Sequence, residues 1–207
     1  MDLWIGTTNK GKLEEFKLFF QREIPELKIH SLAEVPSYVQ PPENGKTFLD
    51  NARIKAKSLK AMKPGCWVMA EDSGLEVTAL GGLPGVHTAR YAGPKASDSE
   101  NMAKLLKMIM LKQASGQSST REAQFHCTMV VYSPEGQEFV FEGILKGQIS
   151  KAPAGNMGFG YDPIFIPEGE TLSLAQIGPG FKNKNSHRAK AAIQFVEKCL
   201  GQLKSLT

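Results

Sequence analysis

The sequence has little cysteine, no long apolar run and only a small excess of positive charge. Its three cysteines, Cys66, Cys127 and Cys199, are odd in number and lie far apart. They argue against a disulfide framework, show no metal-ligand spacing and fit a reducing compartment. No apolar run is long enough to span a bilayer, and the first residues lack a charged segment followed by an apolar one. We therefore expect a soluble cytoplasmic protein without a membrane partner.

The charge balance narrows the possible partners. The chain has 25 basic and 21 acidic side chains, a formal net charge of +4. This excess is too small to indicate a nucleic-acid binder, and the lysines are scattered or lie inside short motifs. Anionic small molecules remain compatible with it. The sequence also lacks the G-x-x-x-x-G-K-[ST] and G-x-G-x-x-G patterns of two common phosphate-binding loops.

Strand and helix patterns alternate early in the chain, and a hairpin pattern comes late. The early elements are a strand at Leu3–Gly6, a helix at Lys12–Arg22, a strand at Leu27–Ser31 and a helix from a Thr47 cap to about Met62. The later ones are a helix capped by Ser97 or Asp98, a hairpin of Glu122–Tyr132 with Glu138–Gln148, and a last helix from about Ser186 to Leu203. This order predicts an α/β fold with a mixed sheet.

The chain is organised around V-M-A-E-D-S-G-L at Val68–Leu75. Val68–Ala70 predict a buried strand that ends on the acids Glu71 and Asp72. Such acids are costly to desolvate unless a metal or a cationic partner takes up their charge. Taken alone, the segment from Asp72 to Gly74 is better explained as an ordinary turn. A functional interpretation depends on the other motifs.

Two other polar segments could serve a phosphorylated ligand. The turn Thr7–Lys12, between a strand and a helix, offers backbone N–H groups and lysines for a phosphate chain, although a helix cap with solvated lysines explains it equally well. Taken alone, Glu43 is better explained as an ordinary acid on the protein surface. If it converged with Glu71 and Asp72, the three would form a hard-oxygen site of the kind that holds magnesium together with substrate phosphates. Lys55 is either a solvated helix residue or a cation aimed at those phosphates.

A glycine-aromatic run, Gly158–Pro163, is the candidate for a base pocket. Its two aromatic rings and fixed carboxylate suit a purine, which offers a π-face and ring N–H groups. A tight turn with core aromatics is the alternative. Lys182 and the Ser186–Arg188 segment add donors for an acceptor-rich ligand such as a carbonyl-bearing base.

Together these motifs resemble one family, the inosine triphosphate pyrophosphatases, also called XTP/dITP diphosphatases. The matching segments run in the family's order and cover nearly the whole chain. They are T-T-N-K-G-K at Thr7–Lys12, E-N-G-K-T-F at Glu43–Phe48, N-A-R-I-K-A at Asn51–Ala56, E-D-S-G-L at Glu71–Leu75, L-G-G-L-P-G-V-H-T-A-R-Y-A-G at Leu80–Gly93, G-F-G-Y-D-P-I-F at Gly158–Phe165 and K-x-x-x-S-H-R at Lys182–Arg188.

The resemblance implies a role for each matching residue. Asp72 would be the general base and, with Glu43, the Mg²⁺ contact, supported by Glu71. Lys12 and Lys55 would be the catalytic cations. The triphosphate would be held by Thr7, Thr8, Asn9, Lys10, Gly11, Lys12, Lys55 and Ser73. The base pocket would consist of Phe159, Gly160, Tyr161, Asp162, Lys182, Ser186, His187 and Arg188.

The resemblance also implies a fold and an activity. Residues 1–207 would form a single domain, a long mixed central sheet flanked by helices, with two lobes, a nucleotide cleft between them and a homodimeric assembly. The activity would be Mg²⁺-dependent hydrolysis of ITP, dITP or XTP to the monophosphate and pyrophosphate. The alternatives are a non-catalytic purine-nucleotide-binding regulatory module and, third, a weakly basic nucleic-acid binder.

Overall fold

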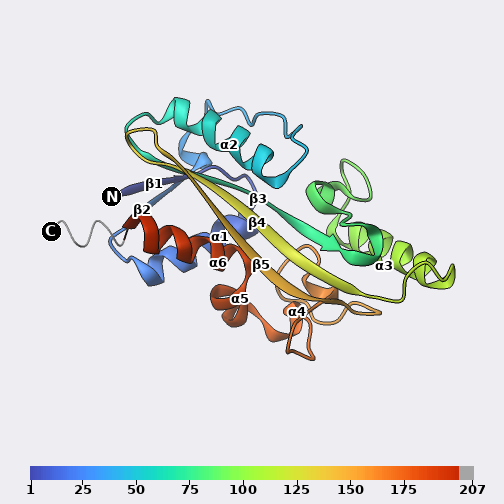
Figure 1. The fold of residues 1–207 in the computed structure, drawn as a ribbon. Coiled ribbons are helices and arrows are strands. Elements are labelled where there is room, and N and C mark those ends of the chain that lie inside the picture. Colours follow the sequence, from blue (N-terminus) through green and yellow to red (C-terminus); the bar gives the residue numbers. More distant parts are fainter. Residues whose placement is uncertain (201–207) are drawn as a thin grey trace. The chain divides into compact units, whose positions relative to one another are not determined.

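A computed structural model describes residues 1–200 of the chain (Figure 1). The strands are β1 (Asp2–Ile5), β2 (Lys28–Ser31), β3 (Trp67–Val77), β4 (Glu122–Tyr132), β5 (Glu138–Ile149) and β6 (Phe165–Pro167). The α-helices are α1 (Lys10–Glu23), α2 (Phe48–Met62), α3 (Asp98–Ala114), α4 (Leu174–Ile177), α5 (Pro179–Asn185) and α6 (His187–Phe195). Short 3-10 helices lie at Leu32–Glu34, Thr78–Leu80, Gly85–Arg90 and Asp162–Ile164, and a π-helical turn, Val196–Leu200, follows α6. None of these helices is long and apolar enough to cross a membrane.

The six strands form one mixed sheet in the order β2-β1-β3-β4-β5-β6. Strand β1 pairs in parallel with both β2 and β3, whereas β5 and β6 are antiparallel. Neighbouring strands β4 and β5 are joined by a tight turn in which the Ser133 N–H donates to the Gln137 carbonyl (3.0 Å). The α/β class, the mixed sheet and the hairpin predicted from the sequence are confirmed.

The predicted helix starts are close to those observed. Thr47 caps α2 in a reciprocal pair with Asp50, and Ser97 caps α3. Helix α1 begins at Lys10, two residues earlier than predicted, because the Asn9 side chain accepts the Lys12 N–H and so caps the helix there. The last helix begins at His187, and its predicted end at residue 203 lies outside the described residues.

The prediction that the central strand ends at Glu71 and Asp72 is wrong. Strand β3 is 11 residues long and continues through both acids to Val77, so the expected turn after Asp72 is absent. Both carboxylates are buried and have polar partners, Lys12 for Glu71 and Asn51 for Asp72. The strand can continue through these residues because an ion pair or a hydrogen bond compensates the cost of removing each carboxylate from water.

The chain divides into two compact units. Unit 1 consists of residues 1–72, residues 127–143 and the segment that begins at His187. Unit 2 consists of residues 73–126 and 144–186. Three strands, β3, β4 and β5, contribute residues to both.

Unit 1 has apolar packing on both faces of its strands. Helices α1 and α6 contact each other (Figure 1) and pack on one face, in a cluster that includes Phe20, Met69 and Phe195. Helix α2 packs against Ala70 in a second cluster. Because neighbouring strand residues point to opposite faces, Met69 and Ala70 place α2 across the strands from α1 and α6.

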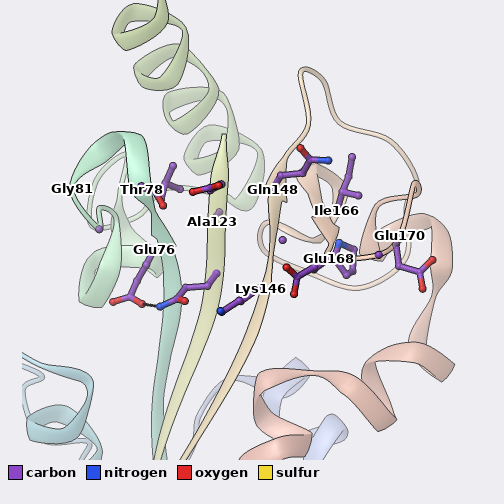
Figure 2. Close-up of a pocket in the computed structure, with 16 residues that line it drawn as sticks. Glu76, Thr78, Gly81, Ala123, Lys146, Gln148, Ile166, Glu168 and Glu170 are labelled. Carbon is purple, nitrogen blue, oxygen red and sulfur yellow. Dashed lines mark hydrogen bonds between the residues drawn. The ribbon is translucent and has the colours of Figure 1, made fainter. Parts of the chain in front are cut away.

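Unit 2 is apolar on one face of its strands and polar on the other. Leu105 and Ile109 of α3 pack with Val77, Phe125 and Ile149 of the strands. The opposite face forms a hollow of about 930 Å³ (Figure 2). Its strand residues include Glu76, Gln124, Lys146 and Gln148. None of the sequence-predicted site residues lines this hollow.

Candidate functional site

Two carboxylates from distant segments converge on one ammonium group in unit 1. The Lys55 Nζ lies 3.4 Å from Glu43 Oε2 and 3.5 Å from Asp72 Oδ1. The second oxygen of Asp72, Oδ2, accepts a hydrogen bond from the Asn51 amide at 3.0 Å. Asn51 and Lys55 are one turn apart on α2, so a single helix face contacts Asp72 at both of its oxygens.

Burial shapes the electrostatics of this group. It raises the pKa of Asp72 above its ordinary value of 3.8, against the opposing attraction of Lys55 and Lys12. Burial also favours neutral Lys55, but Glu71, Asp72 and Glu43 outweigh it and raise the pKa of Lys55. Lys55 therefore remains a cation, while Asp72 is more basic than an exposed aspartate.

Glu71 faces the other side of the strand, where Lys12 is its ion-pair partner. Its Oε1 lies 2.7 Å from Lys12 Nζ, and its Oε2 accepts a contact from the Cys127 thiol at 3.8 Å. Burial opposes ionisation of Glu71, but Lys12, Arg188 and Lys55 outweigh it and lower its pKa to about 2. Glu71 is therefore a fixed anion that holds the Lys12 ammonium.

Glu43, Glu71 and Asp72 do not form one cluster of three acids, the possibility that the sequence left open. Among the described residues, no group of three or more His, Cys, Asp or Glu side chains is arranged to hold a metal ion. The reason is geometric, because adjacent residues of a strand point to opposite faces and Glu71 turns toward α1. Glu43 and Asp72 remain, and two hard carboxylates converging on a cation fit a magnesium ion that is completed by substrate phosphates.

The turn before α1 is linked to Glu43 through the side chain of Gln40. The Thr8 hydroxyl donates to Gln40 Oε1 (2.9 Å), and the Gln40 amide donates to Glu43 Oε1 (2.7 Å). Asn9 caps the helix, and its own N–H donates to the Thr7 hydroxyl oxygen (3.2 Å). Lys10 and Gly11 are the first two residues of α1, so the predicted phosphate turn lies at a helix N-terminus, where anions are stabilised.

The predicted base-pocket run is built around a buried ion pair in unit 2. Lys182 Nζ lies 2.7 Å from Asp162 Oδ2 and 4.5 Å from the centroid of the Phe159 ring. The same Asp162 oxygen accepts the Phe159 N–H at 3.0 Å. Gly158 has a φ of +84°, and a Cβ there would lie 2.1 Å from that oxygen, so only glycine fits.

Neighbouring contacts fix the rest of this run. The Gly160 N–H donates to Asp98 Oδ2 (2.7 Å), and the buried Tyr161 hydroxyl donates to the Thr88 carbonyl (2.9 Å). These contacts of Asp162 and Tyr161 are all with other groups of the protein. Their predicted role as purine contacts stays a prediction.

The Ser186–Arg188 segment belongs partly to each unit. Ser186 ends α5 in unit 2, whereas His187 and Arg188 open α6 in unit 1 and are buried. Arg188 Nε donates to Glu15 Oε2 (2.6 Å), and its Nη1 lies 2.9 Å from His187 Nε2. Glu15 and Glu71 outweigh burial and raise the pKa of Arg188.

Arg188 interacts electrostatically with Glu71, as Lys12 does. The predicted roles of Arg188 and His187 in binding the base stay predictions. Ser73 is the first residue of unit 2 on β3, next to Asp72.

Sequence reasoning missed three polar residues of this region. They are Gln40, which joins the first turn to Glu43; Asn51, which contacts Asp72; and Glu15, which pairs with Arg188. The spacing of Asn51 and Lys55 on one helix face was a usable signal for Asn51. Glu15 had none, because Arg188 is 173 residues away. Gln40 is three residues from Glu43, but its link to the first turn spans 32 residues and no local pattern indicates it.

The fold and these residues define an α/β protein with a converging pair of acids, a cationic turn at a helix start and an aromatic run closed by a lysine–aspartate pair. The chain belongs to the Ham1 family, whose model matches residues 3–198. The family resemblance recognised in the sequence is thereby confirmed.

Known relatives cover nearly all of the chain. A dITP/XTP pyrophosphatase of Bdellovibrio bacteriovorus is 57% identical over 198 residues, which cover 96% of this chain and 97% of that protein. A dITP/XTP pyrophosphatase of Streptococcus thermophilus is 40% identical over 195 residues, which cover 94% of this chain but 58% of that protein. The solved structure of a HAM1 protein from Coxiella burnetii matches with a TM-score of 0.83 and 33% identity, covering 100% of both chains.

Proposed function

We propose that this chain is a pyrophosphatase that hydrolyses non-standard purine nucleoside triphosphates, namely dITP, XTP and ITP, to the monophosphate and pyrophosphate, and so clears them from the nucleotide pool. The names of its relatives at 57% and 40% identity support this reaction. The structural observation that carries it is the convergence of Glu43 and Asp72 on the Lys55 ammonium, because phosphoryl transfer depends on acids and cations held in position.

We propose Mg²⁺ as the cofactor, held by Glu43 and Asp72 together with substrate phosphates. When bound, the ion would neutralise phosphate charge and help to orient the reacting groups. Asp72 would orient a water molecule and accept its proton as the water attacks the α-phosphorus.

Lys12 and Lys55 would neutralise the leaving pyrophosphate, with Glu71 holding Lys12 in place. The turn Thr7–Lys12 would bind the phosphates through its backbone N–H groups and hydroxyls. These roles leave Glu71 as a positioning group, not as a metal ligand.

For the base, Phe159 would stack on the purine and Lys182 would donate to its 6-carbonyl. The other residues proposed for base recognition are Gly160, Tyr161, Asp162, Ser186, His187 and Arg188. Buried donors favour a 6-carbonyl over a 6-amino group, since an amino group would leave them unpaired. Guanine also has a 6-carbonyl, so these donors alone predict no discrimination against it.

We also propose that the whole chain acts as one pyrophosphatase domain, since the family model spans residues 3–198. A homodimer, a cytoplasmic location and the absence of a nucleic-acid partner complete the proposal. The small net charge of +4 supports the last point.

A pyrophosphate-release assay tests the function. With MgCl₂ present, kcat/KM for dITP and XTP should exceed that for dATP by about 10² or more, as expected of a site built to pair with a carbonyl. Tight binding of dITP without release of pyrophosphate would favour the non-catalytic module. Strong, salt-dependent DNA binding without turnover would favour the nucleic-acid binder.

A further inference from the structure

One fully buried amide, the side chain of Asn51, lies next to the proposed metal site of Glu43 and Asp72 and has none of the roles proposed above. The Asn51 side chain on α2 is 0% exposed. Its Nδ2 donates to Asp72 Oδ2 (3.0 Å), and its Oδ1 accepts the N–H of Gly45 (2.8 Å). Gly45 is two residues from Glu43, so a single side chain joins the segment of one acid to the carboxylate of the other.

The two bonds of this amide fix the orientation of the Asp72 carboxylate and the position of the loop that follows Glu43. Because Asn51 contacts Oδ2 of Asp72, the carboxylate is rotated so that Oδ1 faces Lys55 and, beyond it, Glu43. The Gly45 loop also lies close against the amide, since a Cβ at Gly45 would meet Asn51 Oδ1 at 2.7 Å. The two bonds of Asn51 therefore hold the Asp72 carboxylate and the backbone two residues after Glu43 to the same side chain.

We propose that Asn51 is a positioning residue that holds Glu43 and Asp72 at the separation a divalent ion requires. The inference rests on the proposed function, because the acid pair is the proposed metal site. Groups that orient metal ligands typically change metal affinity or activity by about 10 to 100-fold when they are lost. The competing explanation is that Asn51 only satisfies buried polar groups and stabilises the fold.

The chain offers a matched control for that explanation. Asn101 on α3, in unit 2, is 2% exposed and, like Asn51, donates one bond through Nδ2 and accepts one through Oδ1. Its Nδ2 donates to the Ala89 carbonyl (3.2 Å), and its Oδ1 accepts the Ala92 N–H (2.7 Å). Asn101 contacts no proposed metal or phosphate residue through these bonds.

The experiment compares Asn51→Leu with Asn101→Leu, since leucine keeps the volume and removes both bonds. Urea unfolding measures stability, and Mn²⁺ titrations followed by electron paramagnetic resonance measure metal affinity with and without α,β-imido-dITP. Both variants should be destabilised, but only Asn51→Leu should weaken Mn²⁺ binding, by about 10-fold or more. The Mg²⁺ concentration that gives half-maximal pyrophosphate release should rise in parallel.

Equal Mn²⁺ affinity in the two variants would overturn the proposal. If Asn51→Leu does not fold, Gly45→Ala is the second variant. Its Cβ would lie 2.5 Å from Asp50 Cβ and 2.7 Å from Asn51 Oδ1, so it would displace the loop from this end of α2 without changing the amide. It should also weaken Mn²⁺ binding, and wild-type affinity in it would overturn the proposal. A wild type that releases no pyrophosphate would refute the proposed function, whereas the Mn²⁺ comparison would still decide the role of Asn51.

Discussion

The buried ion pair of Glu71 and Lys12 should contribute measurably to stability. Glu71 is 1% exposed, and its pKa is lowered from an ordinary 4.5 to about 2. At about 1.4 kcal/mol per pKa unit, the ionised form stabilises the folded state by ~3 kcal/mol relative to the protonated form. Glu71→Gln keeps the shape and removes the charge, so it should lower the free energy of unfolding at pH 7 by a similar amount.

The same shift predicts how this difference depends on pH. Because the folded-state pKa of Glu71 is depressed, its contribution is complete above pH 4.5 and is lost as the pH falls toward about 2. The stability gap between wild type and Glu71→Gln should therefore shrink to less than half of its neutral value near pH 3.

Urea unfolding in metal-free buffer at both pH values measures the gap. Glu122→Gln removes an exposed acid of β4 and should change the free energy of unfolding by less than about 0.5 kcal/mol. A Glu71→Gln variant as stable as wild type at pH 7 would show that the ion pair adds no stability. A gap that is undiminished at pH 3 would show that the charge of Glu71 is not its source.

Three further predictions concern the proposed reaction. Asp72→Asn keeps the shape but removes the base, so turnover of dITP should fall by about 10² or more while nucleotide binding is largely kept; near-normal turnover would exclude the role. Gly158→Ala would place a Cβ 2.1 Å from Asp162 Oδ2 and should disrupt the ion pair of Asp162 with Lys182. We expect kcat/KM for dITP to fall by about 10-fold or more. An unchanged value would show that this ion pair has no role in binding the purine base. Removal of divalent ions with EDTA should abolish pyrophosphate release and added Mg²⁺ should restore it, and persistent activity in EDTA would contradict the metal assignment to Glu43 and Asp72.

Local pattern was enough to place most elements of the fold. Capping residues such as Thr47 and Ser97 mark helix starts because they satisfy N–H groups only a few residues away. The turn between β4 and β5 is likewise local. The end of β3 was predicted wrongly, because adjacent acids are typical of a turn unless distant partners are present to neutralise and bind them.

The order of motifs along the chain was also sufficient to recognise the family, which the Ham1 match confirms. The grouping of the acids was decided only by tertiary structure. Glu71 and Asp72 are neighbours in the chain, yet one contacts α1 and the other α2, since side chains alternate across a strand. Asp72 instead shares Lys55 with Glu43, a partner set by how α2 and its preceding loop pack against the sheet and not by any local pattern.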